Sequence, residues 1–402
     1  MNYLKILFVL GGASQTIGGH TLSAITLANY TYERGYDVGM LLSPAPSCIF
    51  DLENCKFRLH YKKALYGKGA LLNRPSDIFQ IVKNYHYNVI IAMDWYAAMY
   101  SGLAAVWGKV PVVQVIAGGK GPPSSPLNLP GIILFSEELM ENIPAKFGLG
   151  SEKLILSRGR IDFNAYKDPT NGQGSALSNN HKQGVPRVLS VSRLNKAKGP
   201  SILALFDQVE QYASEKPIEC IVIGEGDAKP ALILRAEKIE KESSSRAKIK
   251  FLGGFRVNQS HLQQADLVVG QGRTVLEAIA SGVPAAVCGE NGYYGLLTTT
   301  SLPALATTNL TGRQYNPFST LTEDLERLIE FREQEESSVY ELAHSMYDAS
   351  LGVEAVEKAI RLIMDYFARV KINRWTLASV WLESWRIGII TLLRKKIMKN
   401  NP

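Results

Sequence analysis

The stretch ADLVVGQGRTVLEAIASGVPAAVCG, residues 265–289, decides the fold of the second half of the chain. An apolar run leads through two glycines into a segment with helical spacing, and a second apolar run follows it. Strands that alternate with helices in this way are typical of βαβ units in a mainly parallel sheet. The stretch therefore predicts an α/β domain.

The same alternation extends outward over most of the sequence. Helical spacing begins at Thr21 and stops at Gly35, and further helix-like stretches lie between short apolar runs. Residues 167–186 are dense in Gly, Ser, Asn and Gln, which is typical of a linker. The expected strands are 4–11, 37–42, 88–93, 110–119 and 131–136 before this linker, and 186–193, 219–226, 248–255, 265–273 and 283–290 after it.

These patterns predict two Rossmann-like domains that face a cleft. The N-terminal domain is expected over 1–166, the linker over 167–186 and the C-terminal domain over 187–351, followed by helices and a basic tail over 352–402. In open α/β sheets, ligands lie beyond the C-terminal ends of the strands, so this cleft is the expected site.

The composition limits the classes of function. With 402 residues, of which 46% are apolar, the chain is long enough for two cores. The formal net charge of +7 fits either a solvated basic surface or attraction to anionic substrates or a membrane surface. The four cysteines have no metal-ligand spacing, so we expect no disulfide framework, no metal and a cytoplasmic location. We expect no nucleic-acid partner.

The C-terminal region contains two amphipathic segments. Residues 352–370 predict a long helix whose apolar face carries Val356, Ile360, Ile363, Phe367 and Val370. The tail 373–402 combines tryptophans with the basic residues Arg394, Lys395, Lys396 and Lys399, which is typical of a helix in a membrane interface. A helix docked on the domains with an exposed basic end is the open alternative. Neither segment, nor the short apolar run at the N-terminus, contains the roughly 18 uncharged apolar residues in a row that a spanning helix needs.

Glycines precede helices at two places. Gly18 and Gly19 lie at the start of the first predicted helix, and Gly270 and Gly272 lie before the helix that contains Glu277. Backbone amides at helix starts favour anions, although a glycine loop that only closes a turn is the alternative. The GxGxxG spacing is absent, which disfavours a nicotinamide dehydrogenase. Apolar neighbours predict that Glu277 is mostly buried and needs a partner, for which a ribose hydroxyl pair is the candidate.

Motifs along the chain resemble those of the GT-B glycosyltransferases, most closely the large retaining family 4. The resemblance covers most of the chain and begins with GGHTLSAITLANYTYERGYDV, residues 18–38. The motifs of the second half are SRLNKAKG (192–199), IVIGEGD (221–227), KIKFLGGF (248–255) and RTVLEAIASGVPAA (273–286). The resemblance implies a two-domain GT-B fold that binds a nucleotide-sugar donor such as a UDP-sugar or GDP-sugar.

The resemblance also implies roles for single residues. Arg193 and Lys198 match the cations that neutralise the donor diphosphate, which stabilises the leaving group without a metal; Lys196 is an additional candidate. Glu277 matches the acid that binds the ribose. The segment Gly253 to Phe255 matches the region that receives the nucleobase.

Two further segments match the family in position. NGYYGLLT, residues 291–298, matches a short loop that receives donor and acceptor groups, so Gly292 and Gly295 predict close backbone approach to a ligand. SRGRID, residues 157–162, matches the segment between the domains, and Arg158 and Arg160 are candidates to face the cleft.

The sequence departs from the family pattern on both sides of the expected site. The first of two family glutamates would fall at Val269; Gln271 and Arg273 are candidates for some of its contacts, and Glu290 is the leading alternative acid. The family's N-terminal histidine is replaced within AGGKG, residues 117–121. Asp94 and His20 are the remaining candidates for an acceptor-side group or base, with a capping role as the alternative for His20.

We therefore expect a retaining glycosyltransferase that moves a sugar to a hydroxyl of a glycan or lipid-linked acceptor in bacterial surface polysaccharide or glycoconjugate synthesis. The tail is expected to contact the inner face of the membrane, where lipid-linked acceptors reside. A non-catalytic partner subunit that binds a sugar nucleotide is the main alternative, and a nucleotide-sugar epimerase is a lesser one.

Overall fold

The chain forms two compact units, which are described separately. The computed structural model describes residues 4–11, 18–42, 55–61, 70–118, 121–122, 125–166, 184–370 and 377–382. The first unit consists of Met1–Arg160 with Ala349–Pro402, and the second is Ile161–Asp348. Most of the predicted linker, the loop 12–17 and the basic tail lie outside the described residues.

The first unit is built on a parallel sheet with the strand order β3-β2-β1-β4-β5-β6-β7. Its strands are β1 (Lys5–Val9), β2 (Asp37–Leu42), β3 (Arg58–Tyr61), β4 (Val89–Ala92), β5 (Val112–Ile116), β6 (Ile132–Leu134) and β7 (Leu154–Leu156). Its helices are α1 (Gly19–Glu33), α3 (Ala70–Tyr85), α4 (Trp95–Gly108), α5 (Glu137–Phe147) and α14 (Ala349–Val370). The order reverses between β1 and β4, which makes this a doubly wound sheet.

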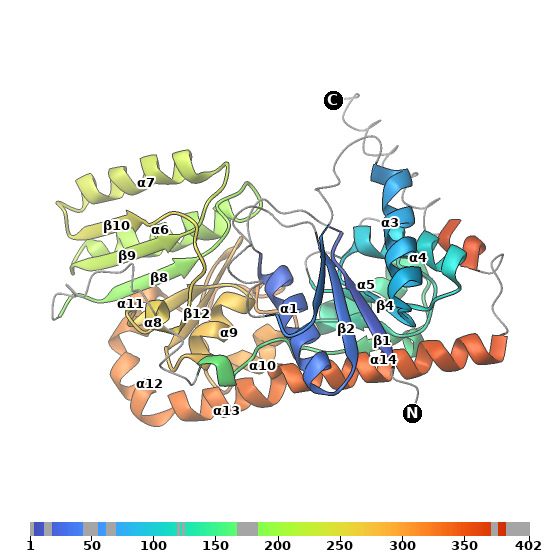
Figure 1. Ribbon diagram of the computed structural model, residues 1–402. Coiled ribbons are helices and arrows are strands. Elements are labelled where there is room, and N and C mark those ends of the chain that lie inside the picture. The colour runs from blue at the N-terminus through green and yellow to red at the C-terminus, as the bar shows by residue number, and fades with distance from the viewer. Residues whose placement is uncertain are drawn as a thin grey trace. The chain divides into compact units, whose positions relative to one another are not determined.

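The second unit has a six-stranded sheet with the order β10-β9-β8-β11-β12-β13. Figure 1 labels β10, β9, β8 and β12 of this sheet. Its strands are β8 (Arg187–Val191), β9 (Ile218–Ile223), β10 (Ala247–Phe251), β11 (Leu267–Gly270), β12 (Ala285–Gly289) and β13 (Gly292–Leu296). Its helices are α6 (Gly199–Ala213), α7 (Lys229–Glu242), α8 (Gln259–Leu262), α9 (Arg273–Ala280), α10 (Ser301–Ala306), α11 (Leu321–Glu326), α12 (Leu328–Gln334) and α13 (Glu336–Tyr347). Here the order reverses between β8 and β11.

The expected loop at 291–298 is wrong, because most of it is the strand β13. This strand pairs antiparallel with β12, and the Tyr294 side chain is fully buried. A Cβ on Gly292 would lie 2.7 Å from Pro317, and one on Gly295 would lie 2.6 Å from Ser319. The glycines that suggested a ligand-binding loop are therefore required by packing inside the unit.

The C-terminal helix α14 belongs to the first unit rather than to a region of its own. Val356, Ile360 and Ile363 are buried in that unit's core, as the amphipathic pattern predicts. The second unit is thus one continuous segment between two parts of the first. Its ends meet, because the Ile161 amide donates to the Tyr347 carbonyl at 3.0 Å. The observed division lies at residues 160/161 and 348/349, whereas the sequence predicted boundaries at 166 and 351.

A short stretch of the tail is described, and it docks on the first unit. The Trp381 indole donates to the Met99 carbonyl on α4 at 2.9 Å. A Cβ on Gly102 would lie 2.9 Å from the same indole ring. This part of the tail follows the docked-helix alternative. Within the described ranges, no helix has the length and apolar character needed to cross a membrane.

Candidate functional site

Arg193 and Lys198 lie in the loop between β8 and α6, at the point where the strand order of the second sheet reverses. Such a switch point is where open α/β sheets bind ligands. Lys198 is the N-cap residue of α6, and its amide is held by the Asn195 side chain at 3.0 Å. The Arg193 side chain is in an exposed position of the loop. The apolar run, the turn and the helix of this motif therefore bring both cations to one edge of the sheet.

The IVIGEGD motif supports this loop from the neighbouring strand. The Ser192 amide donates to the Ile223 carbonyl at 3.0 Å, and the Leu194 amide donates to the Glu225 carbonyl at 2.9 Å. A Cβ on Gly224 would lie 1.8 Å from the Ser192 carbonyl oxygen. Only glycine allows the two backbones to come this close, so this glycine of the motif fixes the position of Arg193.

Lys198 reaches across the switch point to Gln271. Its ammonium group donates to the Gln271 side-chain oxygen, and the Gln271 amide donates in turn to the Cys288 carbonyl at 3.0 Å. Burial lowers the pKa of Lys198, and the positive charges of Arg193 and Arg313 lower it further, against the opposing effect of Glu290. The positive charge of Arg313, a residue that the sequence analysis did not single out, thus also acts on Lys198.

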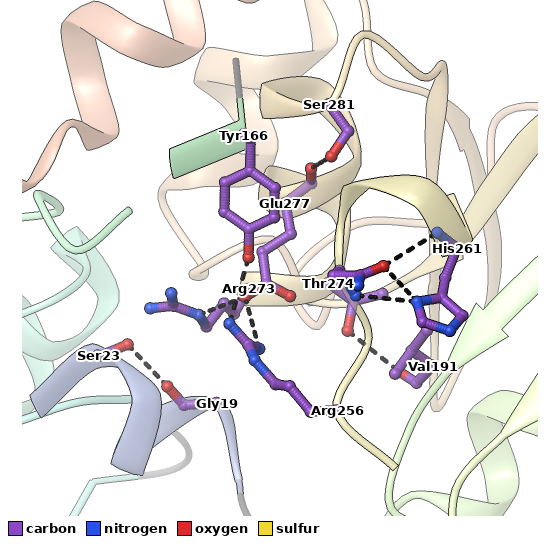
Figure 2. Close-up of polar contacts among 11 residues, drawn as sticks. Gly19, Ser23, Tyr166, Val191, Arg256, His261, Arg273, Thr274, Glu277 and Ser281 are labelled. Carbon is purple, nitrogen blue, oxygen red and sulfur yellow. Dashed lines mark hydrogen bonds and ion pairs between the residues drawn. The ribbon is translucent and has the colours of Figure 1, made fainter. Parts of the chain in front are cut away.

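The glycines before α9 serve the fold more than they expose amides. The Gly272 amide donates to the Leu310 carbonyl at 3.1 Å, so the expected free amide is already used. A Cβ on Gly270 would lie 3.0 Å from the Thr274 side chain. The Thr274 hydroxyl donates to the Val191 carbonyl at 3.0 Å and ties α9 to the end of β8 (Figure 2).

Glu277 is buried, as predicted, but its partners are protein side chains. Arg273 donates to its carboxylate at 2.7 Å, and Arg256 lies 3.4 Å away. Figure 2 shows both arginines and the Tyr166 ring directed toward the Glu277 carboxylate. Burial alone would raise the pKa of Glu277, but the two arginines and hydrogen bonds from Arg273 and Tyr166 lower it. The carboxylate is therefore ionised and compensated without a ribose.

Sequence reasoning missed Arg256 and Tyr166 as partners of Glu277. Tyr166 comes from the short turn Asn164–Tyr166 at the start of the second unit, far from α9 in sequence. Burial raises the pKa of its hydroxyl, as does the nearby Glu277 charge. The hydroxyl therefore stays protonated and donates to the carboxylate.

The segment expected to receive a nucleobase lies at the end of β10. Gly253 has a φ of +79°, and its carbonyl accepts from the Gly224 amide at 2.8 Å. The Phe255 ring is half-buried and lies 5.1 Å from the His261 ring. This segment is thus joined through Gly224 to the loop that carries Arg193.

In the first unit, Asp94 and His20 lie at the corresponding switch point. Asp94 accepts from the Ala97 amide at 2.8 Å and caps α4, and it also accepts from the Gly11 amide at 2.7 Å. The His20 ring lies 3.7 Å from its carboxylate. Burial would raise the pKa of Asp94, but His20 and the two amides lower it. A carboxylate held in this way is suited to orienting its neighbours rather than to accepting a proton.

The glycines at the start of α1 have structural bonds of their own. Gly18 is the N-cap residue of α1, and its carbonyl accepts from the Thr21 amide at 2.9 Å. The Gly19 carbonyl accepts from the Ser23 hydroxyl at 2.8 Å. Gly18 is buried, and Gly19 is exposed.

The arginines after β7 are engaged within the first unit. Arg158 forms an ion pair with Glu137 on α5. Arg160 is buried, donates to the Arg158 carbonyl at 2.9 Å and lies over the Phe135 ring. In the part of the chain that the structure describes, no group of His, Cys, Asp and Glu side chains is arranged to hold a metal ion.

Comparison with known proteins finds similarity to glycosyltransferases. Residues 176–298 match the family model "Glycosyl transferases group 1". A glycosyltransferase from Rickettsia africae ESF-5 superimposes with a TM-score of 0.66 and 15% identity, over 90% of this chain and 99% of that one. Anabaena HepE in complex with UDP superimposes with a TM-score of 0.62 and 17% identity, over 89% of this chain and 100% of that one.

The chain has the GT-B fold of these structures, and its second unit contains most of the residues that match the group 1 model. A curated relative, the UDP-N-acetylglucosamine--N-acetylmuramyl-(pentapeptide) pyrophosphoryl-undecaprenol N-acetylglucosamine transferase of Buchnera aphidicola subsp. Schizaphis graminum, is 23% identical over 124 residues. That alignment spans 28% of this chain and 34% of the relative. The group 1 match contains Arg193, Lys198 and Glu277, whereas Arg313 and the residues of the first unit lie outside it.

Proposed function

We propose that the chain is a glycosyltransferase that moves a sugar from a nucleoside diphosphate donor to a hydroxyl group of a glycan or lipid-linked acceptor. The observation that carries this proposal is the placement of Arg193 and Lys198 at the switch point of the group 1 domain. Two cations on a backbone fixed by neighbouring strands provide a preorganised positive field. A departing diphosphate is the group in sugar transfer that needs such a field.

We propose the donor and the stereochemistry from the similarity of the chain to known glycosyltransferases. HepE was solved with UDP, which supports a UDP-sugar as the first donor to test. Retention of the anomeric configuration is proposed from the resemblance to the retaining family. The cations stabilise charge on the leaving diphosphate directly, and we propose that no metal ion is needed for that step.

On the acceptor side, we propose that His20 contacts the acceptor and Asp94 orients His20. Asp94 is fixed by two backbone amides, so its position does not depend on the ligand. We propose that the neighbouring carboxylate, 3.7 Å from the ring, sets the orientation of the imidazole. The sugar and the acceptor themselves are left open by these contacts.

The double variant Arg193→Ala and Lys198→Ala tests the donor assignment. We expect it to abolish UDP or GDP binding in calorimetry, because both fixed charges that face the diphosphate are removed. The circular dichroism spectrum should stay that of the wild type, since neither side chain is part of the buried core. Unchanged affinity for the nucleotide would refute the assignment.

A non-catalytic sugar-nucleotide-binding subunit is the second candidate, and one observation favours it. Val269, at the place of the first family glutamate, is fully buried on β11 and cannot contact a sugar by a charged group. The two candidates differ in turnover. A binding subunit would take up the nucleotide diphosphate with normal affinity yet release none from a sugar nucleotide with a panel of acceptors.

We also propose that the basic tail brings the protein to an anionic membrane surface from the cytoplasmic side. Its cluster of Arg and Lys beyond residue 393 is the feature that supports this, although these residues lie outside the described ones. Truncation after Leu382 keeps the docked Trp381. We expect that variant to lose cosedimentation with phosphatidylglycerol vesicles, and equal cosedimentation of both proteins would contradict the proposal.

A further inference from the structure

The loop after α10 is fixed to the same strand ends that hold Lys198. The Leu310 carbonyl accepts from the Gly272 amide at 3.1 Å, at the start of α9. Gly289 lies at the end of β12, and a Cβ on it would lie 2.4 Å from the Thr311 carbonyl oxygen. The loop therefore lies against the ends of β11 and β12.

Arg313 is part of a defined turn in that loop. Gly312 has a φ of +71°, and a Cβ there would lie 2.3 Å from the Tyr294 ring. The Tyr315 amide closes the turn by donating to the Gly312 carbonyl at 2.8 Å. Gly312, which precedes Arg313, is thus packed against the buried Tyr294 ring, the turn is closed by Tyr315, and Arg313 itself is half-buried.

Lys198 reaches the same place from the other side of the switch point. Its ammonium group is held by Gln271, which lies between β11 and α9, and Gln271 is held by the Cys288 carbonyl on β12. The positive charge of Arg313 acts on Lys198 together with that of Arg193, and Glu290 is the acid that opposes them. The loop that carries Arg313 and the Lys198 side chain therefore meet at the ends of β11 and β12.

We propose that Arg313 is a third cation of the donor site, which binds the diphosphate group together with Arg193 and Lys198. This inference rests on the proposed function. Because arginine offers a planar fork of donors that suits phosphate oxygens, it adds directional hydrogen bonds to the charge of Lys198. The third cation lies about 115 residues beyond Lys198 and outside the residues that match the group 1 model.

Isothermal titration of the full chain with nucleotides tests this role. UDP, GDP and ADP are titrated beside UMP, GMP and AMP into the wild type, Arg313→Ala and Arg313→Lys. Arg327→Ala is the matched control, because Arg327 is a half-exposed arginine of the same unit that forms an ion pair with Glu335. Circular dichroism verifies that each variant is folded.

We expect Arg313→Ala to weaken binding of the preferred diphosphate by at least about tenfold, since a hydrogen bond to a charged group is lost. Binding of the matching monophosphate should change by less than about threefold, and Arg313→Lys should recover part of the loss. Equal affinity of wild type and Arg313→Ala for the diphosphate would overturn the inference alone. Equal losses for diphosphate and monophosphate would also overturn it. A wild type that binds none of the diphosphates would instead overturn the proposed function and the inference with it.

Discussion

Glu277 illustrates at the residue scale what a sequence pattern can and cannot predict. Its apolar neighbours correctly indicate burial, and burial of a carboxylate correctly demands a partner. The identity of the partners was not predictable, because Tyr166 and Arg256 reach it from distant segments. Arg313 was not predicted for a similar reason. Its segment has no periodic pattern, and it comes near Lys198 only through the contacts of the residues just before it.

Substitution of Glu277 by Gln should destabilise the protein in the absence of any ligand. Loss of the carboxylate leaves Arg273 and Arg256 without their shared counter-charge, and breaking a buried ion pair costs about 3 kcal/mol. Urea denaturation at neutral pH measures this, with Glu237→Gln on α7 as the exposed control. An unchanged unfolding midpoint, together with weaker nucleotide binding, would instead make Glu277 a ribose ligand with little structural role.

The pH dependence of that stability has a defined direction. Folding lowers the pKa of Glu277, so the unfolded chain binds the proton more readily. The contribution of Glu277 to stability is therefore present above the ordinary carboxyl pKa and is lost as the pH falls through the lowered value. The variant Glu277→Gln should lose this part of the acid sensitivity.

At the scale of elements, hydrophobic periodicity predicted the parallel strands and their helices, while glycine-rich segments were harder to interpret. Glycine at 292 and 295 suggested a ligand loop, yet the backbone there forms β13. The reason is that glycine marks any close approach, whether by a ligand or by the protein itself. Gly224 gives the opposite case, in which the close approach within the protein builds the candidate site.

Replacement of Gly224 by Ala should weaken nucleotide binding although it removes no charge. The new Cβ would overlap the Ser192 carbonyl oxygen and displace the loop that carries Arg193. We expect the affinity for UDP to fall by about tenfold, as for the loss of one charged hydrogen bond. Gly184→Ala is the control, because Gly184 also has a positive φ but has no atom within 4 Å of its added Cβ. Equal affinities of the two variants would show that the loop position does not depend on Gly224.

At the scale of the whole molecule, the sequence indicated two α/β domains but not how the chain is shared between them. The amphipathic face of residues 352–370 was correctly predicted to be buried, since Val356, Ile360 and Ile363 lie in a core. Which core covers them depends on contacts such as that of Gly352 with the Gly159 carbonyl. A helical pattern specifies a buried face and leaves its partner undefined.

Because the first unit needs both ends of the chain, truncation should affect the two units differently. A protein that ends at Asp348 lacks α14 and exposes apolar surface of the first core, whereas residues 161–348 keep the whole second core. We expect the fragment 161–348 to unfold cooperatively in urea, monitored by circular dichroism. The fragment 1–348 should show a single transition from its second unit and aggregate through its first. The reason is that burial of the apolar face of α14 is worth several kcal/mol at about 25 cal/mol per Å². Two cooperative transitions in 1–348 would instead mean that α14 contributes little to the stability of the first unit.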